Sequence, residues 1–195
     1  MSMLAGRSFM TDAQFLSGRL LLAMPGMGDP RFERSVNVMC VHDEHGALGI
    51  GIGHIRAGVS FHALLREVGV DPGDTPDREV HHGGPVEPGR GFVLHSPDWG
   101  GQGTIEVAPL CAMSASVDVL RAIADGTGPS KWIFALGYAG WGPGQLDAEL
   151  AASAWLISDV DASIVFETPA ATMWEQAIRR LGADPGKLHS GHGVH

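Results

Sequence analysis

The stretch SVNVMCVHDEHGALGIGIGHI, residues 35–55, decides the fold class of this chain. Its first part alternates apolar residues and is rich in valine, which predicts a strand over residues 35–43. The short EHG turn that follows predicts a hairpin whose second strand covers residues 47–55. Gly49, Gly51 and Gly53 share one face of that strand, because strand side chains alternate. A strand face without side chains predicts that something packs closely against it.

The elements on either side of this hairpin predict an α+β fold. Strands and helices are interleaved, but strands joined by short turns also occur, so we expect one compact domain with a mixed, largely antiparallel sheet flanked by helices. Whether the sheet is barrel-like stays open, and a doubly wound α/β fold is the alternative. Further strands are expected over residues 20–24, 91–96, 104–110, 131–138 and 161–167. Helices are expected over residues 60–69, 114–126 and 144–156 and from Pro169 to Gly182.

The length of 195 residues fits a single domain, which we place over residues 15–182. Residues 1–14 are expected to form an N-terminal arm, and residues 183–195 a flexible tail rich in histidine and glycine. The Pro- and Gly-rich stretch 70–90 is interpreted as a long surface loop with one short strand; a domain linker is the alternative.

The charge of the chain argues against nucleic acid and membrane partners. Lys and Arg number 13 against 22 Asp and Glu, the formal net charge is −9, and no basic run occurs. Because binding to DNA depends on Lys and Arg at phosphates, direct DNA binding is disfavoured. No apolar run is long enough to span a membrane, and no signal peptide is recognisable. The two cysteines lack a C-x-x-C spacing, which indicates reduced thiols in a cytoplasmic protein.

Two glycine-rich loops are the best candidates for a ligand surface. In LGYAGWGPGQLDAEL, residues 136–150, Gly140 and Gly142 match a dinucleotide fingerprint, but its third glycine is replaced by Gln145. Asp147 in the following turn would repel a phosphate, so the loop is expected mainly to turn the chain and let Trp141 fold over the sheet. Binding of a neutral or cationic ligand at this loop is the alternative. The loop MPGMGDP, residues 24–30, has the same form, with Asp29 as an expected helix cap, and the two loops could line one cleft.

No catalytic residue, metal site or cofactor site is predicted. The ten histidines lack metal-ligand spacing, and His81 and His82 are expected on opposite faces of a strand. No G-x-S-x-G nucleophile motif occurs. Cys40 is expected to be a small buried residue, and Cys111 could meet His95 as a thiol–imidazole pair, although inert thiols are commoner.

Three blocks carry a resemblance to a known family. FLSGRLLLAMPGMGDPRFERSVNVMCVHDEHGALGIGI (15–52), GGPVEPGRGFVLHS (83–96) and LGYAGWGPGQLDAEL (136–150) occur in the order in which the AlgH/YqgE family of small bacterial proteins has them. The resemblance implies a single α+β domain, a family label of transcriptional regulator that rests on genetic association, and no catalytic assignment. The chain departs from the family at Gly51–Ile55, where relatives have Asn-Arg-Pro.

The functional hypothesis is a non-enzymatic cytoplasmic binding or regulatory domain that acts through a protein or small-molecule partner, and not by direct DNA binding. The alternative is an enzyme with its site between the Gly26–Asp29 and Gly140–Asp147 loops. The identity of the partner and the oligomeric state stay open. The candidate surface comprises Pro25, Gly26, Asp29, Gly83, Gly84, Pro85, His95, Gly140, Trp141, Gly142 and Gln145.

Overall fold

The structure is a computed structural model that describes residues 15–26 and 32–188. Within these residues the strands are β1 Arg19–Ala23, β2 Val36–Asp43, β3 Gly46–Gly51, β4 Val80–His82, β5 Val86–His95, β6 Ile105–Ala108, β7 Cys111–Ser114, β8 Trp132–Trp141 and β9 Trp155–Asp159. The helices are α1 Phe61–Glu67, α2 Val117–Asp125, α3 Gln145–Ala151, α4 Ala162–Glu167 and α5 Ala170–Arg180, followed by the short 3-10 helix Pro185–Lys187. The arm expected at residues 1–14 and the end of the tail lie outside the described residues.

One sheet organises the molecule, in the order β6-β7-β5-β8-β3-β2-β1-β9. All of these neighbours pair antiparallel, and β4 adds the one parallel pair in the described sheet, against β8. The α+β class and the largely antiparallel sheet are therefore confirmed. The barrel-like form is wrong: β6 and β9 end the sheet without pairing to each other, although β6 packs near β2.

Strand β8 joins the two halves of the sheet. Its first part pairs with β5 on one side and β4 on the other, and its last residues, Ala139–Trp141, pair with β3. The expected hairpin is β2–β3, with a bulge between Met39 and Val41. Its second strand ends at Gly51, four residues earlier than predicted, because Gly51 N–H turns to donate to the Gly83 carbonyl at 2.7 Å.

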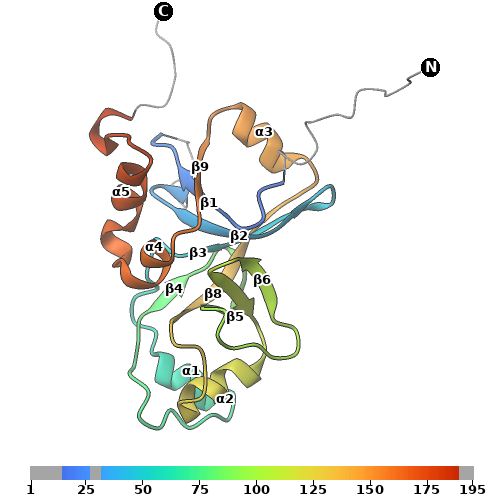
Figure 1. Cartoon of the computed structure of the whole chain (residues 1–195), viewed down its shortest axis with the longest axis vertical. Coiled ribbons are helices and arrows are strands. Elements are labelled where there is room, and N and C mark those ends of the chain that lie inside the picture. Colours follow the sequence, from blue (N-terminus) through green and yellow to red (C-terminus); the bar gives the residue numbers. More distant parts are fainter. Residues whose placement is uncertain (1–14, 27–31, 189–195) are drawn as a thin grey trace, which may run out of the picture.

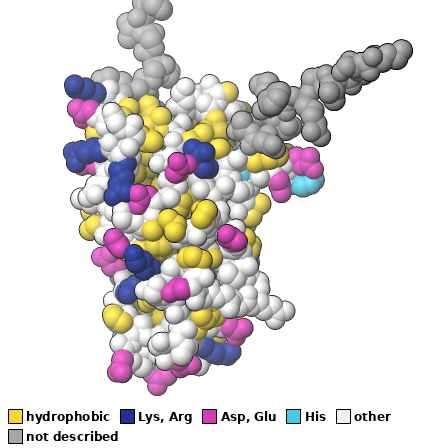
Figure 2. Space-filling view, in the orientation of Figure 1, with side chains coloured by type: hydrophobic (Ala, Val, Ile, Leu, Met, Phe, Trp, Pro, Cys, Tyr) yellow, Lys and Arg dark blue, Asp and Glu magenta, His cyan; other side chains and the backbone are white. Residues whose placement is uncertain are grey.

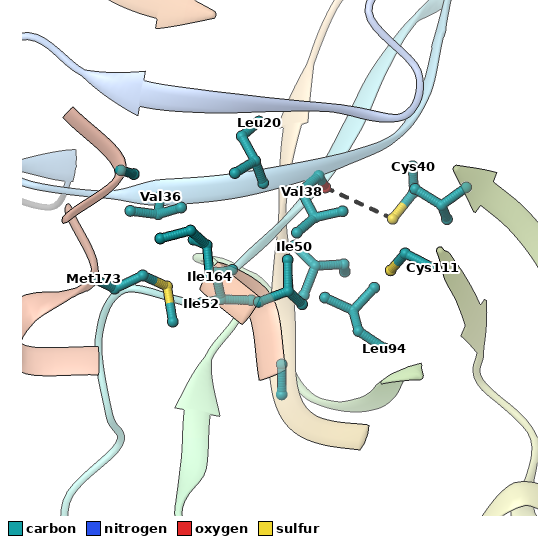
Figure 3. Packing of buried hydrophobic residues seen from close by; sticks show 14 of the residues in the cluster. Leu20, Val36, Val38, Cys40, Ile50, Ile52, Leu94, Cys111, Ile164 and Met173 are labelled. Carbon is teal, nitrogen blue, oxygen red and sulfur yellow. Dashed lines mark hydrogen bonds between the residues drawn. The ribbon is translucent and has the colours of Figure 1, made fainter. Parts of the chain in front are cut away.

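The helices cover different parts of the sheet (Figure 1). α3 packs on β3 and β9, while α5 packs on β1 and α4 lies against α5. α1 and α2 lie side by side at the opposite end of the molecule. Three apolar clusters fill the spaces between these layers. Figure 3 shows the largest, in which Cys40 and Cys111 lie beside each other among aliphatic side chains.

Several predicted elements are wrong and have local physical causes. Residues 161–167, expected as a strand, form α4, because the Asp161 carboxylate accepts from the N–H groups of Ser163 and Ile164 and starts a helix. The helix expected over residues 144–156 ends at Ala151, since Ser153 adopts a positive φ of 58°, and Trp155 opens β9.

The region around residues 104–116 also differs from expectation. The single strand expected at residues 104–110 is the β6–β7 hairpin, and β7 occupies residues 111–114, so α2 starts three residues later than predicted. The short strand expected within residues 70–90 is β4.

Candidate functional site

Gly83 and Gly84, from the GGP block, are buried where the chain after β4 crosses β8. A Cβ atom at Gly83 would lie 2.1 Å from the Gly137 carbonyl oxygen, and one at Gly84 would lie 2.0 Å from the Tyr138 carbonyl carbon. Gly137 itself has a φ of 78° and no room for a side chain against the Gly84 carbonyl oxygen. We call these three glycines the glycine crossing. The sequence blocks 83–96 and 136–150 therefore contact each other through their backbones. Pro85, which follows Gly84, is exposed.

His95 is fully buried and both of its ring nitrogens have partners. Nε2 lies 2.8 Å from Ser114 Oγ and Nδ1 lies 2.8 Å from the Ser96 carbonyl oxygen, which leaves no ring nitrogen for Cys111. Ser114 Oγ is also 2.8 Å from Thr104 Oγ1. Burial lowers the pKa of His95 below its ordinary value of 6.5. This arrangement links β5 to β7.

The two thiols are inert by their surroundings. Cys40 and Cys111 are buried and free. Burial raises the pKa of Cys111 to about 12, and burial together with the neighbouring Cys111 raises the pKa of Cys40 as well. Because the thiolate is the nucleophile, neither cysteine is suited to covalent chemistry in the folded state.

Trp141 folds back onto the sheet. Its indole N–H donates to Glu149 Oε2 at 2.6 Å, and the N–H of Trp155 donates to the same oxygen at 3.3 Å. Gln145 Oε1 accepts from Gly142 N–H at 3.0 Å, which closes the turn between β8 and α3. The indole N–H of Trp141 and the Gln145 side-chain oxygen are therefore hydrogen-bonded to groups of this loop and of α3.

The two glycine-rich loops lie on the same part of the sheet. Pro25 and Gly26 follow β1, whose Ala23 pairs with Trp155, and the Trp155 ring meets Trp141 edge-on at 6.0 Å. Packed apolar side chains, among them Leu21, Leu146 and the two tryptophans, therefore fill the space between the described parts of the loops. Asp29 and its expected capping role lie outside the described residues.

A polar cluster that the sequence did not suggest joins β2 to α3. His42 Nδ1 accepts from Leu16 N–H at 2.9 Å, and its Nε2 lies 3.7 Å from Asp147 Oδ1. Ser17 Oγ accepts the backbone N–H of His42 at 2.9 Å. Ser17 therefore contacts the backbone of His42, while the two ring nitrogens face Leu16 and Asp147, so the geometry is not that of a catalytic triad.

His81 and His82 point to opposite faces of β4, as the alternation predicts. His81 is buried and its Nδ1 lies 2.8 Å from the Ile52 carbonyl oxygen. His82 Nδ1 lies 3.2 Å from the guanidinium of Arg56, which also donates to the carbonyls of Pro88 and Leu136. Arg56, missed by the sequence analysis, thus ties β5 and β8 to the segment after β3.

An open groove lies on the sheet face opposite α3 and has a volume of about 590 Å³. Cross-strand pairs form its floor: Val41 faces Leu48, Leu48 faces Gly140, and Val86 faces Tyr138. Because Gly140 has no side chain, the row of apolar residues is hollow at its centre. The exposed fraction of Val41 is 37%. We call this feature the Gly140 groove; it contains Gly140 and Trp141 of the predicted surface, whereas its aliphatic floor was missed.

Across residues 15–26 and 32–188, no group of three or more His, Cys, Asp or Glu side chains is arranged to hold a metal ion. No helix in the same part of the chain is long and apolar enough to cross a membrane.

Comparison with known proteins gives consistent matches. The family model described as AlgH-like (DUF179) matches residues 20–186. A UPF0301 protein of Novosphingobium aromaticivorans is 59% identical, with 92% of this chain and 96% of the relative covered. A UPF0301 protein of Rhizorhabdus wittichii is 50% identical, with 89% and 93% covered.

Solved structures agree with these matches. The solution structure of AlgH from Pseudomonas aeruginosa is 37% identical, with a TM-score of 0.76 and all of both chains covered. A Corynebacterium diphtheriae protein shares the fold at 23% identity, with a TM-score of 0.68 over 85% of this chain and 86% of that one.

Proposed function

The chain belongs to the AlgH-like family, and we propose that it is a non-enzymatic cytoplasmic binding or regulatory domain that acts through a protein partner seated in the Gly140 groove. The observation that carries the proposal is the groove itself. Its lining includes partly exposed aliphatic and aromatic side chains, among them Val41, Leu48 and Tyr138. An apolar centre with a polar rim is the usual arrangement of a protein–protein interface.

The charge at the groove indicates the chemistry of the partner. The hairpin tip beside it carries Asp43 and Glu44, and Asp43 and His45 belong to the lining. We therefore expect an apolar side chain of the partner to enter the hollow at Gly140 and a Lys or Arg of the partner to approach the hairpin tip.

A regulatory role through DNA contact is not part of the proposal. Figure 2 shows Lys and Arg side chains scattered among Asp and Glu on the face in view, with no continuous basic stripe. The net charge of −9 opposes a phosphate backbone as well. The family label of regulator is better matched by an action through another protein.

The test uses Gly140→Leu. A Cβ atom at Gly140 would meet Tyr138 Cε2 at 3.5 Å and Val86 Cγ2 at 3.8 Å, which are ordinary contacts, so the new side chain fills the groove without strain. Gly142→Leu is the matched control, because its nearest neighbour is Gln145 Oε1 at 3.9 Å and it lies outside the groove lining.

Tagged wild-type, Gly140→Leu and Gly142→Leu proteins are used to capture partners from a bacterial lysate under identical conditions. We expect wild type and Gly142→Leu to retain the same protein and Gly140→Leu to lose it, with melting temperatures unchanged. Equal capture by all three proteins would refute the groove as the partner surface. A reaction catalysed by the pure protein and abolished by Gly140→Leu would refute the non-enzymatic assignment.

A further inference from the structure

A second hollow, separate from the Gly140 groove, lies between helices α1 and α2 and strands β5 and β8, at the end of the molecule remote from α3 (Figure 1). Its volume is about 160 Å³. Most of its lining is apolar and comes from all four elements. The lining comprises Phe61, Leu64, Leu65, Glu67, Val68, Gly89, Gly91, Val93, Ser114, Ala115, Ser116, Val117, Leu120, Phe134 and Leu136.

Strand β5 leaves open space at Gly89, where an added Cβ atom would meet nothing within 4 Å. Gly89 and Gly91 stand on this part of the strand, and the Phe134 ring lies so close over Gly91 that a Cβ atom there would be 2.7 Å from its Cζ atom. Phe61 holds that ring from the other side, with centroids 5.2 Å apart. The walls are therefore fixed by packed aromatic rings, and the space between them is preformed.

The size and lining define the apolar part of a ligand. An apolar cavity of about 150 Å³ can accept a molecule of the size of benzene. The cavity is open on one side, so a ligand can carry a polar group that stays at the rim.

The side chains at the rim of the cavity determine which polar group a ligand can carry. Among the described residues, Glu67 is the only charged side chain of the lining, and no hydrogen bond or ion pair to another described residue occupies its carboxylate. Ser116, at the start of α2, makes no side-chain cap bond, so its hydroxyl is also available. The nearby Asp118 of the first turn of α2 is paired with Arg121 at 3.5 Å. An unpaired carboxylate repels anions and attracts cations.

We propose that this cavity binds a small aromatic or short-chain aliphatic amine, with its hydrocarbon part between α1 and α2 and its ammonium group beside Glu67 and Ser116. Burial of the hydrocarbon part contributes most of the affinity, and the Glu67 carboxylate repels acids of the same shape.

The test uses three probes of one shape: benzylamine, benzyl alcohol and benzoate. Each is titrated into the full chain carrying ¹³C-labelled methyl groups, and binding is followed by NMR at the methyls of Leu64, Leu65, Val68 and Leu120. We expect benzylamine to shift these methyls, to bind about two- to fivefold more tightly than benzyl alcohol, and benzoate to bind most weakly, as an exposed charge pair predicts. Methyls that do not respond to any probe, or benzoate binding as tightly as benzylamine, would overturn the proposal.

Variants separate the charge from the cavity. Glu67→Gln should bring benzylamine to the affinity of benzyl alcohol, whereas Glu106→Gln, an exposed acid on β6 away from the cavity, should leave the preference intact. Leu64→Trp fills the space and should weaken all three probes at least tenfold. Undiminished binding to a folded Leu64→Trp protein would place the probes elsewhere and refute the site; the methyl mapping of the wild-type chain decides the question if this variant does not fold.

Discussion

Replacement of Gly84 by alanine tests whether the GGP block serves the fold. Gly84 has a φ of 152°, a conformation that costs a residue with a side chain about 1–3 kcal/mol. The new Cβ atom would lie 2.0 Å from the Tyr138 carbonyl carbon, and relief of such an overlap in a packed interior typically costs another 1–3 kcal/mol or more. We therefore expect Gly84→Ala to lower the free energy of unfolding by about 3–5 kcal/mol, a large part of the roughly 5–15 kcal/mol that a folded protein has.

The loss is measured by urea unfolding followed by circular dichroism. For a domain of this size, it corresponds to a fall in melting temperature of roughly 6–20 °C. Gly89→Ala is the control, because Gly89 has an ordinary φ and a Cβ atom added there would meet nothing within 4 Å, and we expect a change within about 1 kcal/mol. A loss below about 1 kcal/mol for Gly84→Ala would show that backbone packing does not explain the GGP sequence. Gly83, Gly84 and Pro85 would then again be candidates for a ligand surface.

Three further outcomes follow from the described contacts. Burial lowers the pKa values of His81 and His95 below their ordinary value of 6.5, so the unfolded chain binds protons at a higher pH than the folded chain does; the free energy of unfolding should therefore fall as the pH drops below about 6.5, which melting curves recorded at decreasing pH check. Cys40 and Cys111 should not react with a disulfide reagent such as dithiobis-nitrobenzoate at neutral pH until the protein is unfolded in guanidinium, which absorbance at the released thiolate measures. Glu149→Ala leaves two indole N–H groups without their acceptor and should lower the free energy of unfolding by about 1–3 kcal/mol in urea.

The sequence predicted best where a local pattern and a turn agreed. The β2–β3 hairpin has both alternation and a short reversal, and α1 has its expected cap, with Ser60 Oγ accepting the N–H of Ala63 at 3.2 Å. Prediction failed around residues 153–167, where a short apolar run fits a strand and a helix equally well. There the outcome depended on the Asp161 cap and on the pairing of Trp155 with Ala23, and the second of these joins residues far apart in the chain.

The candidate surface could be predicted only in part for the same reason. Gly140 and Trp141 entered the predicted surface because their loop is unusual in composition. No local sequence pattern distinguishes Val41, Leu48 and Tyr138 from core residues, because each lies in a strand with an ordinary apolar pattern. They form a groove only because β8 brings β5 and β3 to its two sides, and no pattern within one strand contains that information.

The glycine crossing constrains the path of the backbone. The blocks GGP and LGY resemble ligand loops in composition, yet in this chain Gly83, Gly84 and Gly137 pack against backbone at distances that exclude any side chain. Glycines under that constraint are required by the path of the backbone. Any member of the family whose chain crosses the same strands needs glycine at the same positions. The Gly140 groove and the α1–α2 cavity are under no such constraint at Gly140 or Glu67, where larger or uncharged side chains would fit. Differences in partner or ligand between members of the family should therefore be sought at these positions and not in the glycine blocks that identify it.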